Sequence, residues 1–339
     1  MTDTRLPLLL DVDTGIDDTL ALLYVAASPE AEIVAVTCLS GNAPAADTDR
    51  NTRAVLALAG RGDIEVAIGR PIPLIRPLEV TPETHGPNGI GYAEPPEPPA
   101  PAEPRRFGPQ LIVDEARRRP GELTLVTLGP LTNLAIAVLI EPELPRLLKR
   151  WILMGGAFRA PGNTTPVSEW NVHCDPEAAR ICFGAWQTAI DADPTVPRAL
   201  AMGLDATEKA RIFPGDVADL AARAGDSAVE PRSPIVRTIN DALRFYFEFH
   251  EKYDGFYGAF IHDPLVVAAA LDPTLIRTEP AHVDVDTSGG PGDAQTIADW
   301  RKLKGKAPNV DVAVEADADE FLRRLVDRVG ALAARIGPD

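Results

Sequence analysis

Apolar runs of strand length alternate with longer helical patterns through the first 184 residues. Short runs rich in Leu, Ile and Val are typical of buried strands, and the longer segments between them have helical spacing. The predicted strands are residues 8–11, 32–39, 65–68, 123–128 and 150–154. The predicted helices are residues 17–27, 45–59, 110–118, 131–140 and 175–184. This alternation predicts an α/β fold with an open, mostly parallel sheet and helices on both faces.

The pattern is less regular after this point. We expect a glycine-rich mobile loop at 84–91 and a stiff surface loop at 94–104, where proline favours extended backbone. An irregular region at 213–233 is expected before an aromatic helix. The remaining elements are this helix at 240–253, a strand and loop at 282–300, a strand at 310–314 and a closing amphipathic helix at 317–334. We find no internal repeat and expect a single domain over residues 1–339.

Polar and turn residues follow the predicted strands. Asp11 and Asp13 lie at the end of the first strand, and Asn42 follows the second. Leu128-Gly129-Pro130 and Gly155-Gly156 end two later strands. In an open α/β sheet, the ligand crevice lies beyond the carboxyl ends of the strands. These residues are therefore expected to converge on one crevice.

Four carboxylates occur at the first strand-to-helix turn, in Asp11-Val12-Asp13-Thr14-Gly15-Ile16-Asp17-Asp18. They would repel one another unless a positive charge lay among them, and their oxygens suit calcium or magnesium. Helix capping could explain one of Asp17 and Asp18. It does not explain Asp11 and Asp13, whose alternation places both side chains on one face of the strand end. The sequence therefore predicts a metal site here.

Composition and charge narrow the range of partners and compartments. The formal net charge of -17 argues against nucleic acid, whose phosphates would be repelled, and suits a small neutral or cationic ligand or a metal cation. Cys38, Cys174 and Cys182 lack paired metal-ligand spacing, so we expect reduced, structural thiols. Because neither a signal peptide nor a transmembrane segment is evident, we expect no membrane partner and a cytoplasmic location.

Further segments carry polar residues in particular arrangements. They are Ser40-Gly41-Asn42, Leu128-Gly129-Pro130-Leu131-Thr132-Asn133, the stretch from Met154-Gly155-Gly156 through Asn163 to Glu169-Trp170-Asn171, and His262-Asp263-Pro264. Together with the N-terminal aspartates, they resemble the inosine-uridine preferring nucleoside hydrolase family, from Leu8 to about Ala334. Thr14 stands where the family usually has proline, at a turn position that bears no ligand. The resemblance implies a Rossmann-like nucleoside hydrolase fold, ribonucleoside hydrolysis to free base and ribose, and a homodimer or homotetramer.

The resemblance also implies a set of site residues. A calcium ion would be held by Asp13, Asp18, Asp263 and the main-chain carbonyl of Leu128, which suits the oxygen-rich shell of this ion. The substrate would be held by Asp17, Asn42 and Asn171 at the 2′ and 3′ hydroxyls, by Asn163 and Glu169 at the 5′ hydroxyl, and by Met154 in the same site. Asp11 would support the aspartate turn from outside the ligand shell.

The chemistry of this cleavage assigns further roles. Positive charge develops on the ribose ring while a water attacks, and Asp13 could accept the proton of that calcium-polarised water. The departing base leaves more easily when protonated, which suits a histidine. His262 precedes a predicted ligand and His85 lies on the glycine-rich loop, so both are candidate acids. Tyrosines of the aromatic region, at positions 246, 253 and 257, could instead relay the proton or simply pack.

Two other functions fit part of the pattern. A haloacid-dehalogenase-like phosphatase would use Asp11 as nucleophile with magnesium, but leaves Asn163, Glu169 and Asp263 unexplained. A non-catalytic nucleoside-binding or ribose-binding protein on the same scaffold is the other alternative, since function resides in the site rather than the fold. The sequence contains no phosphate-binding loop of the glycine-lysine-serine type, which favours a nucleoside over a nucleotide. Base preference stays open.

Overall fold

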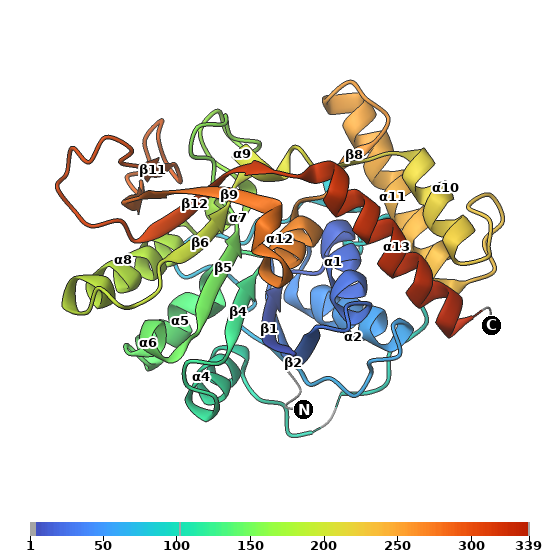
Figure 1. The fold of residues 1–339 in the computed structure, drawn as a ribbon, viewed down its shortest axis with the longest axis horizontal. Coiled ribbons are helices and arrows are strands. Elements are labelled where there is room, and N and C mark those ends of the chain that lie inside the picture. The colour runs from blue at the N-terminus through green and yellow to red at the C-terminus, as the bar shows by residue number, and fades with distance from the viewer. Residues whose placement is uncertain (1–4, 102, 338–339) are drawn as a thin grey trace.

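Eight strands form one central sheet in the computed structural model, which describes residues 5–101 and 103–337. Neighbouring strands are parallel throughout, except for the last pair, which is antiparallel (Figure 1). In spatial order the strands are β3 (Val66–Ile68), β2 (Ala31–Cys38), β1 (Leu6–Val12), β4 (Thr124–Thr127), β5 (Arg150–Met154), β6 (Ala199–Met202), β12 (Val310–Ala316) and β9 (Ile276–Ala281). The predicted open, mostly parallel α/β sheet is confirmed.

The order of the strands places a crevice beside β1. The chain runs outward from β1 through β2 to β3, and then returns to the other side of β1 as β4, β5 and β6. This reversal is a topological switch point, where loops from neighbouring strands diverge and leave room for a ligand. The ends of β1, β2 and β4 therefore border the same space.

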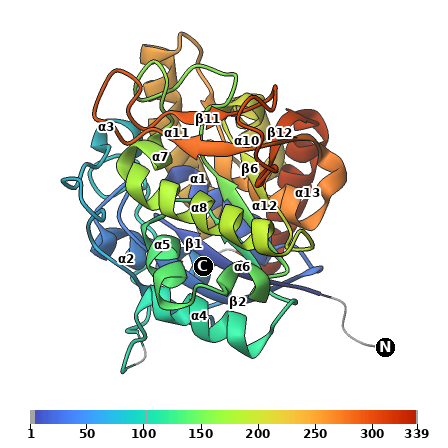
Figure 2. The same cartoon turned by 90° about the vertical axis from the view of Figure 1, so that its left-hand side faces the viewer.

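Helices cover both faces of the sheet. One face carries α1 (Ile16–Ala26), α2 (Ala45–Leu58), α12 (His262–Leu271) and α13 (Ala318–Ile336), with α10 (Pro214–Arg223) and α11 (Pro234–Tyr253) packed on them. The other face carries α4 (Gly108–Arg118), α5 (Thr132–Ile140), α6 (Leu144–Leu147) and α8 (Pro176–Ala192), which lie together in Figure 2. Leu8 and Leu10 of β1 enter the first core and Leu9 the second, so this strand reads as a continuous apolar run.

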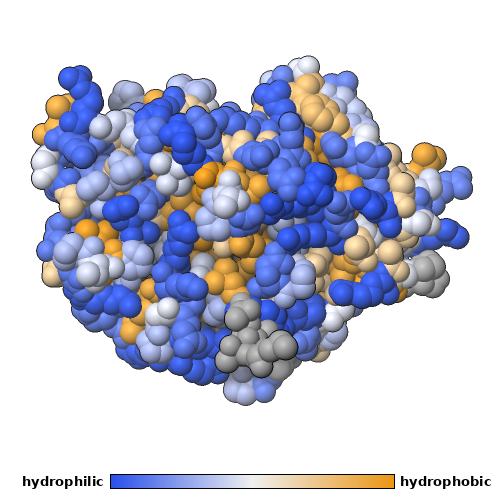
Figure 3. Space-filling model, in the orientation of Figure 1, coloured by the Kyte–Doolittle hydropathy of each residue, from blue (hydrophilic) through white to orange (hydrophobic). Residues whose placement is uncertain are grey.

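Short elements complete the described chain. They are α3 (Pro82–His85), α7 (Trp170–Cys174), α9 (Leu204–Thr207), the 3-10 helix η1 (Pro273–Leu275), and the antiparallel pairs β7 (Arg211–Ile212) with β8 (Ala259–Phe260) and β10 (Val283–Val285) with β11 (Thr296–Ala298). Among the described residues, no helix combines the length and apolar character needed to cross a bilayer. Figure 3 shows mainly hydrophilic residues on one face, with apolar residues in scattered groups.

The structure corrects several sequence-based boundaries. The region expected to be irregular at 213–233 contains α10, whose buried Val217, Leu220 and Ala221 have helical spacing. The helix predicted at 175–184 continues to Ala192 as α8, and α12 holds Pro264 in its first turn. Proline is tolerated in the first turn of a helix, because the amide hydrogen it lacks has no partner there. The three cysteines are buried and unbridged, as expected.

Candidate functional site

Asp13 lies in the turn between β1 and α1, and the loops after β2 and β4 contact its carboxylate from two sides. The Oδ2 of Asp13 accepts a hydrogen bond from the backbone N–H of Asn42 at 2.7 Å. Gly41 and Gly129 approach the same carboxylate so closely that a Cβ on either residue would collide with its oxygens. The Oδ1 of Asp13 is buried and has no hydrogen-bond partner within the described residues. The loops after β2 and β4 therefore fix this carboxylate and leave one oxygen available.

Asp18 combines a capping role with a second available oxygen. Its Oδ2 accepts hydrogen bonds from the backbone N–H of Gly15 at 2.8 Å and from Nδ2 of Asn42 at 3.1 Å. This is the capping interaction that the sequence allowed for one of the two adjacent aspartates. The Oδ1 of Asp18 is also buried without a partner in the described part of the chain. Capping thus accounts for Oδ2 of Asp18 and leaves its Oδ1 unexplained.

Packing of α1 against α12 joins Asp17 and Asp18 to Asp263, which is far away in the sequence. One carboxylate oxygen from each of these three residues lies within 4.8 Å of the other two. The backbone N–H groups of His262 and Asp263, at the start of α12, stabilise the charged form of Asp17 and partly oppose the rise in its pKa. Asp17, which the resemblance assigned to the sugar, therefore lies within the same cluster as two predicted calcium ligands.

We call Asp13, Asp17, Asp18 and Asp263 the acidic cluster. A bound cation would relieve the repulsion among these buried carboxylates. Burial raises the pKa of Asp17 to about 7 and that of Asp18 to about 6, and burial with neighbouring carboxylates raises the pKa values of Asp13 and Asp263 well above their usual range. None of the ion pairs between described side chains involves these acids. Two unpartnered oxygens in an all-oxygen donor set fit a hard divalent cation such as Ca²⁺.

The carbonyl of Leu128 lies at the end of β4 and accepts a hydrogen bond from Nδ2 of Asn171 at 2.7 Å. The same amide group is 3.3 Å from the carbonyl and from the sulfur of Met154. A carbonyl oxygen has two lone pairs, so the Leu128 oxygen retains capacity for a second partner. The structure thus brings the predicted residues Leu128, Met154 and Asn171 together.

Glu169 is buried at the start of α7. Its Oε1 accepts from the N–H of Asn171 at 2.8 Å, and its Oε2 accepts from those of Gly156 at 2.9 Å and Val172 at 3.1 Å. Burial raises its pKa, and the charge of Asp17 adds to the effect. Asn163 is exposed, and its Oδ1 caps the N–H of Trp170 at 3.0 Å. The structure places Asn163 next to α7 but gives it no hydrogen bond to the acidic cluster.

The two predicted histidines occupy different positions. Nδ1 of His262, at the first residue of α12, is 2.8 Å from Oγ1 of Thr207, and its ring is partly exposed. His85 is buried, and its Nδ1 accepts from the N–H of Ile16 at 3.1 Å, directly beside the aspartate turn. Burial lowers the pKa of each histidine to about 3. His85 thus lies beside the start of α1 and His262 at the start of α12, where the acidic cluster forms.

Two residues near these histidines, His250 and Thr207, give no signal in the sequence. The ring of Tyr246 lies 5.5 Å from that of His85, and His250 lies 4.6 Å from Tyr246 on the other side. His250 belongs to no motif, yet its Nε2 is buried without a partner in the region that the structure describes. Thr207, which contacts His262, belongs to no motif either. Only the packing of α9 and α11 reveals these contacts.

Asp11 makes its hydrogen bonds to residues outside the acidic cluster. Its Oδ1 accepts from Oγ1 of Thr37 at 2.5 Å and from Nδ2 of Asn133 at 2.8 Å. Burial raises its pKa to about 7. These contacts tie the end of β1 to β2 and α5, which agrees with the supporting position expected from the sequence.

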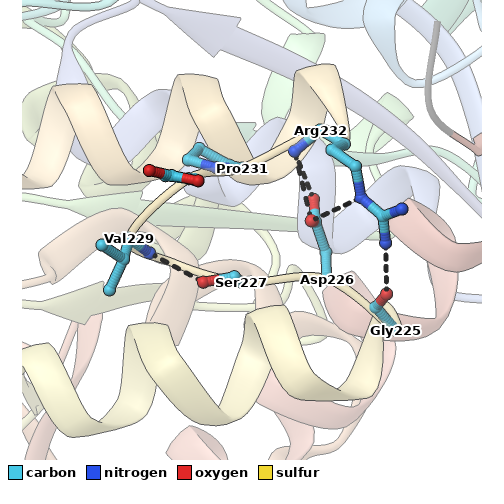
Figure 4. Close-up of a pocket in the computed structure, with 7 residues that line it drawn as sticks. Gly225, Asp226, Ser227, Val229, Pro231 and Arg232 are labelled. Atoms are coloured by element: carbon cyan, nitrogen blue, oxygen red, sulfur yellow. Dashed lines mark hydrogen bonds and ion pairs between the residues drawn. The ribbon is translucent and has the colours of Figure 1, made fainter.

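A surface hollow between α10 and α11 lies elsewhere and contains none of the predicted site residues (Figure 4). There, Asp226 accepts hydrogen bonds from the backbone N–H groups of Arg232 and Ser233, the latter at 2.7 Å. The Asp226 side chain is buried by the loop that it closes. We interpret this acid as structural.

Comparisons with known proteins match nearly the whole chain. A family model described as inosine-uridine preferring nucleoside hydrolase matches residues 8–323. The pyrimidine-specific ribonucleoside hydrolase RihA of Citrobacter koseri is 36% identical over 337 residues, which cover 97% of this chain and 99% of the relative. A solved purine-preferring ribonucleoside hydrolase from Gardnerella vaginalis superimposes with a TM-score of 0.87 at 32% identity, over 97% of this chain and 99% of that one. A plant nucleoside hydrolase, the PpNRh1 enzyme, gives 0.86 at 29% identity, over 96% and 99%. The range that the family model matches includes both Asp13 and Asp263.

Proposed function

Because the chain belongs to the inosine-uridine preferring nucleoside hydrolase family and is a ribonucleoside hydrolase, we propose that it cleaves the N-glycosidic bond in a calcium-dependent reaction. The observation that carries the calcium dependence is the acidic cluster, with its two buried, unpartnered oxygens and no basic partner among the described residues. Asp13, Asp18, Asp263 and the Leu128 carbonyl would hold the ion. When bound, calcium supplies an anchor for neighbouring ribose hydroxyls and polarises the attacking water.

The residues around the cluster would orient the ribose. Asp17, Asn42 and Asn171 offer carboxylate and amide groups at the 2′ and 3′ hydroxyls, and the two amides are already fixed by other hydrogen bonds. Glu169 would accept from the 5′ hydroxyl, and its negative charge disfavours a 5′-phosphate. Fixed polar groups lower the reorganisation needed when positive charge develops on the sugar ring. We include Met154 and Asn163 in this substrate site.

Asp13 would act as the general base. In this step, the water oxygen bonds to C1′, the C1′–N bond breaks with its electron pair going to the nucleobase, and the water proton passes to the carboxylate of Asp13. His262 would assist the departing base by a hydrogen bond or a proton, with Thr207 holding its Nδ1. His85 is a second candidate for this assistance. These roles conserve atoms and charge and use only residues adjacent to the cluster.

Release of free ribose tests the activity. The purified chain is expected to release ribose from inosine or uridine in the presence of calcium, and a chelator is expected to stop the release. Tight nucleoside binding without ribose release would instead support the binding-protein alternative. A wider panel of purine and pyrimidine nucleosides would determine base preference.

His262→Ala is expected to slow hydrolysis of inosine more than that of a nitrophenyl riboside. The hypoxanthine base needs protonation or a strong hydrogen bond to leave, whereas nitrophenolate leaves without one. The two kcat values should be measured for variant and wild type, and we expect a loss of about 100-fold for inosine alone. Equal losses on both substrates would contradict an acid role.

Gly41→Ala is expected to lower turnover by about 100-fold, because a Cβ here would displace the carboxylate of Asp13. Gly184→Ala is the matched control, since a Cβ at this position in α8 meets nothing within 4 Å and Ala favours a helix. Initial rates at saturating calcium, with circular dichroism to monitor folding, make the comparison. Equal rates for the two variants would show that the position of Asp13 matters little.

A further inference from the structure

The acidic cluster is enclosed by protein in this conformation. Asp13, Asp17, Asp18, Asn42 and Asn171 are each at most 7% exposed, so a ribonucleoside needs an opening to reach them. A segment of the surface must therefore move during each catalytic cycle. The segment that covers the aspartate turn is residues 82–93, which comprise α3 and the turns after it, and we call it the lid.

The lid contacts the protein on two sides. Toward α11, a Cβ on Gly91 would lie 2.8 Å from Cβ of Phe245 and 3.0 Å from the carbonyl of Ala242, so only glycine fits there. The positive φ of Gly91, 61°, also favours glycine. Toward the site, His85 accepts the N–H of Ile16. Figure 2 shows α3 beside α11. The lid is therefore closed onto both α11 and the aspartate turn.

The third contact of the lid is a single side chain of α2. Nδ2 of Asn51 donates to the carbonyl of Asn88 in the lid at 2.8 Å and to the carbonyl of Thr14 in the aspartate turn at 3.3 Å. Both acceptors are carbonyl oxygens, so only the nitrogen of the amide group can face them. Asn51 is 1% exposed. Its two hydrogen bonds thus join the lid to the turn between Asp13 and Gly15.

On the side of α2, the two hydrogen bonds of Asn51 are the main polar link between the lid and the aspartate turn. A Cβ on Gly89 would lie 2.9 Å from Cβ of Ala43 and 3.2 Å from Nδ2 of Asn51, so glycine lets the lid approach. A hollow of about 370 Å³ lies beside Asn51 and Asn88, between α2 and the lid. Side-chain packing is therefore incomplete where the amide group makes its bonds.

We propose that Asn51 is a positioning residue that couples closure of the lid to the placement of the aspartate turn. This proposal rests on the proposed function for its effect on turnover, although the coupling itself is a property of the protein without substrate. When the lid closes, the amide group of Asn51 binds both Asn88 and Thr14. These two bonds keep Asp13 in place beside the attacking water. When the lid opens, the bond to Asn88 breaks and the turn loses part of its support.

Hydrogen exchange measured by mass spectrometry tests the coupling. In Asn51→Leu, which keeps the size of the side chain and removes both donors, amide exchange is expected to become about fivefold faster in the lid and also in residues 13–18. Exchange in β4 and β5 is expected to stay unchanged. Arg50→Ala is the matched control, because Arg50 borders the same hollow and forms its ion pair with Asp47 of the same helix. Exchange in this variant should equal that of wild type.

The outcomes separate this proposal from the proposed function. Unchanged exchange in both segments of a folded Asn51→Leu protein would overturn the coupling, and faster exchange in the lid alone would reduce Asn51 to a simple lid contact and overturn it as well. If Asn51→Leu does not fold, Asn51→Ser provides the same comparison with a smaller change. A wild-type protein that releases no ribose would contradict the proposed function, whereas the exchange result would still decide the coupling.

Discussion

Asp13→Asn is expected to lower kcat for ribonucleoside hydrolysis by about a thousandfold while leaving the fold intact. The amide has the shape of the carboxylate but cannot accept the proton of the attacking water, and general bases contribute about 10²–10⁴ in rate. The Asn42 N–H can still donate to the remaining oxygen at this position. The loss should therefore occur in kcat while the chain still folds. Initial rates of ribose release at saturating calcium, with thermal unfolding, provide the measurement.

Stability distinguishes this role from a structural one. Asp13 lies among other buried carboxylates, which raise its pKa, so removing its charge relieves repulsion in the calcium-free protein. We expect the unfolding temperature of Asp13→Asn in chelator to equal or exceed that of wild type. Asp226→Asn is the matched control, since Asp226 is a buried acid of the loop in Figure 4, and its kcat should not change. Near-wild-type turnover of calcium-replete Asp13→Asn would falsify the general-base assignment.

Removal of calcium is expected to abolish turnover and to lower the free energy of unfolding. A ligand that binds only the folded state stabilises it by about 2.7 kcal/mol at 100 times its Kd. The carboxylates bind the ion in their charged form, so this stabilisation should grow with pH. Turnover and unfolding are to be compared in calcium and in chelator. Chelated protein with full turnover, or calcium with no effect on unfolding, would refute the metal site.

The pH dependence of the chelated protein follows from the same acids. Without the ion, the folded-state pKa values of Asp17 and Asp18, about 7 and 6, exceed their ordinary value of 3.8. The folded state then binds more protons than the unfolded state between about pH 4 and pH 7. Its stability should fall as pH rises through this window. Asp263→Asn should weaken both the fall and the effect of calcium, which urea unfolding at pH 5, 6, 7 and 8 would measure.

Much of the sheet could be predicted from local pattern. Strands β1, β2, β4 and β5 are largely buried, so each is a short, mostly apolar run that differs from the helices around it. The runs of β6 and β9 were missed because four apolar residues, or six mostly polar ones, are not distinctive alone. The position of β12 between β6 and β9 could not be predicted either. Strand pairing depends on packing of the whole chain, which no local pattern encodes.

The site was predictable to different degrees. Asp13 and Asp18 stand in one motif, and Asn42 follows the neighbouring strand, so their proximity follows from the parallel sheet. Asp263 could be linked to them only through the family resemblance, because no spacing rule connects residues so distant. Asn51, Thr207 and His250 gave no signal, since Asn, Thr and His at these positions are ordinary in helices. Their roles depend on which backbone or ring lies opposite them.

The sequence by itself determined the chemistry available to this protein: the aspartates at the first strand end, the amides that follow other strands, and the alternation that makes a parallel sheet. These are local properties, fixed by side-chain type and by the periodicity of buried positions. Tertiary structure alone decided which groups meet. Packing of α1 on α12 brings Asp263 to Asp17 and Asp18, and all three are buried there. Carboxylates interact over a few ångströms, and only the folded chain sets such distances.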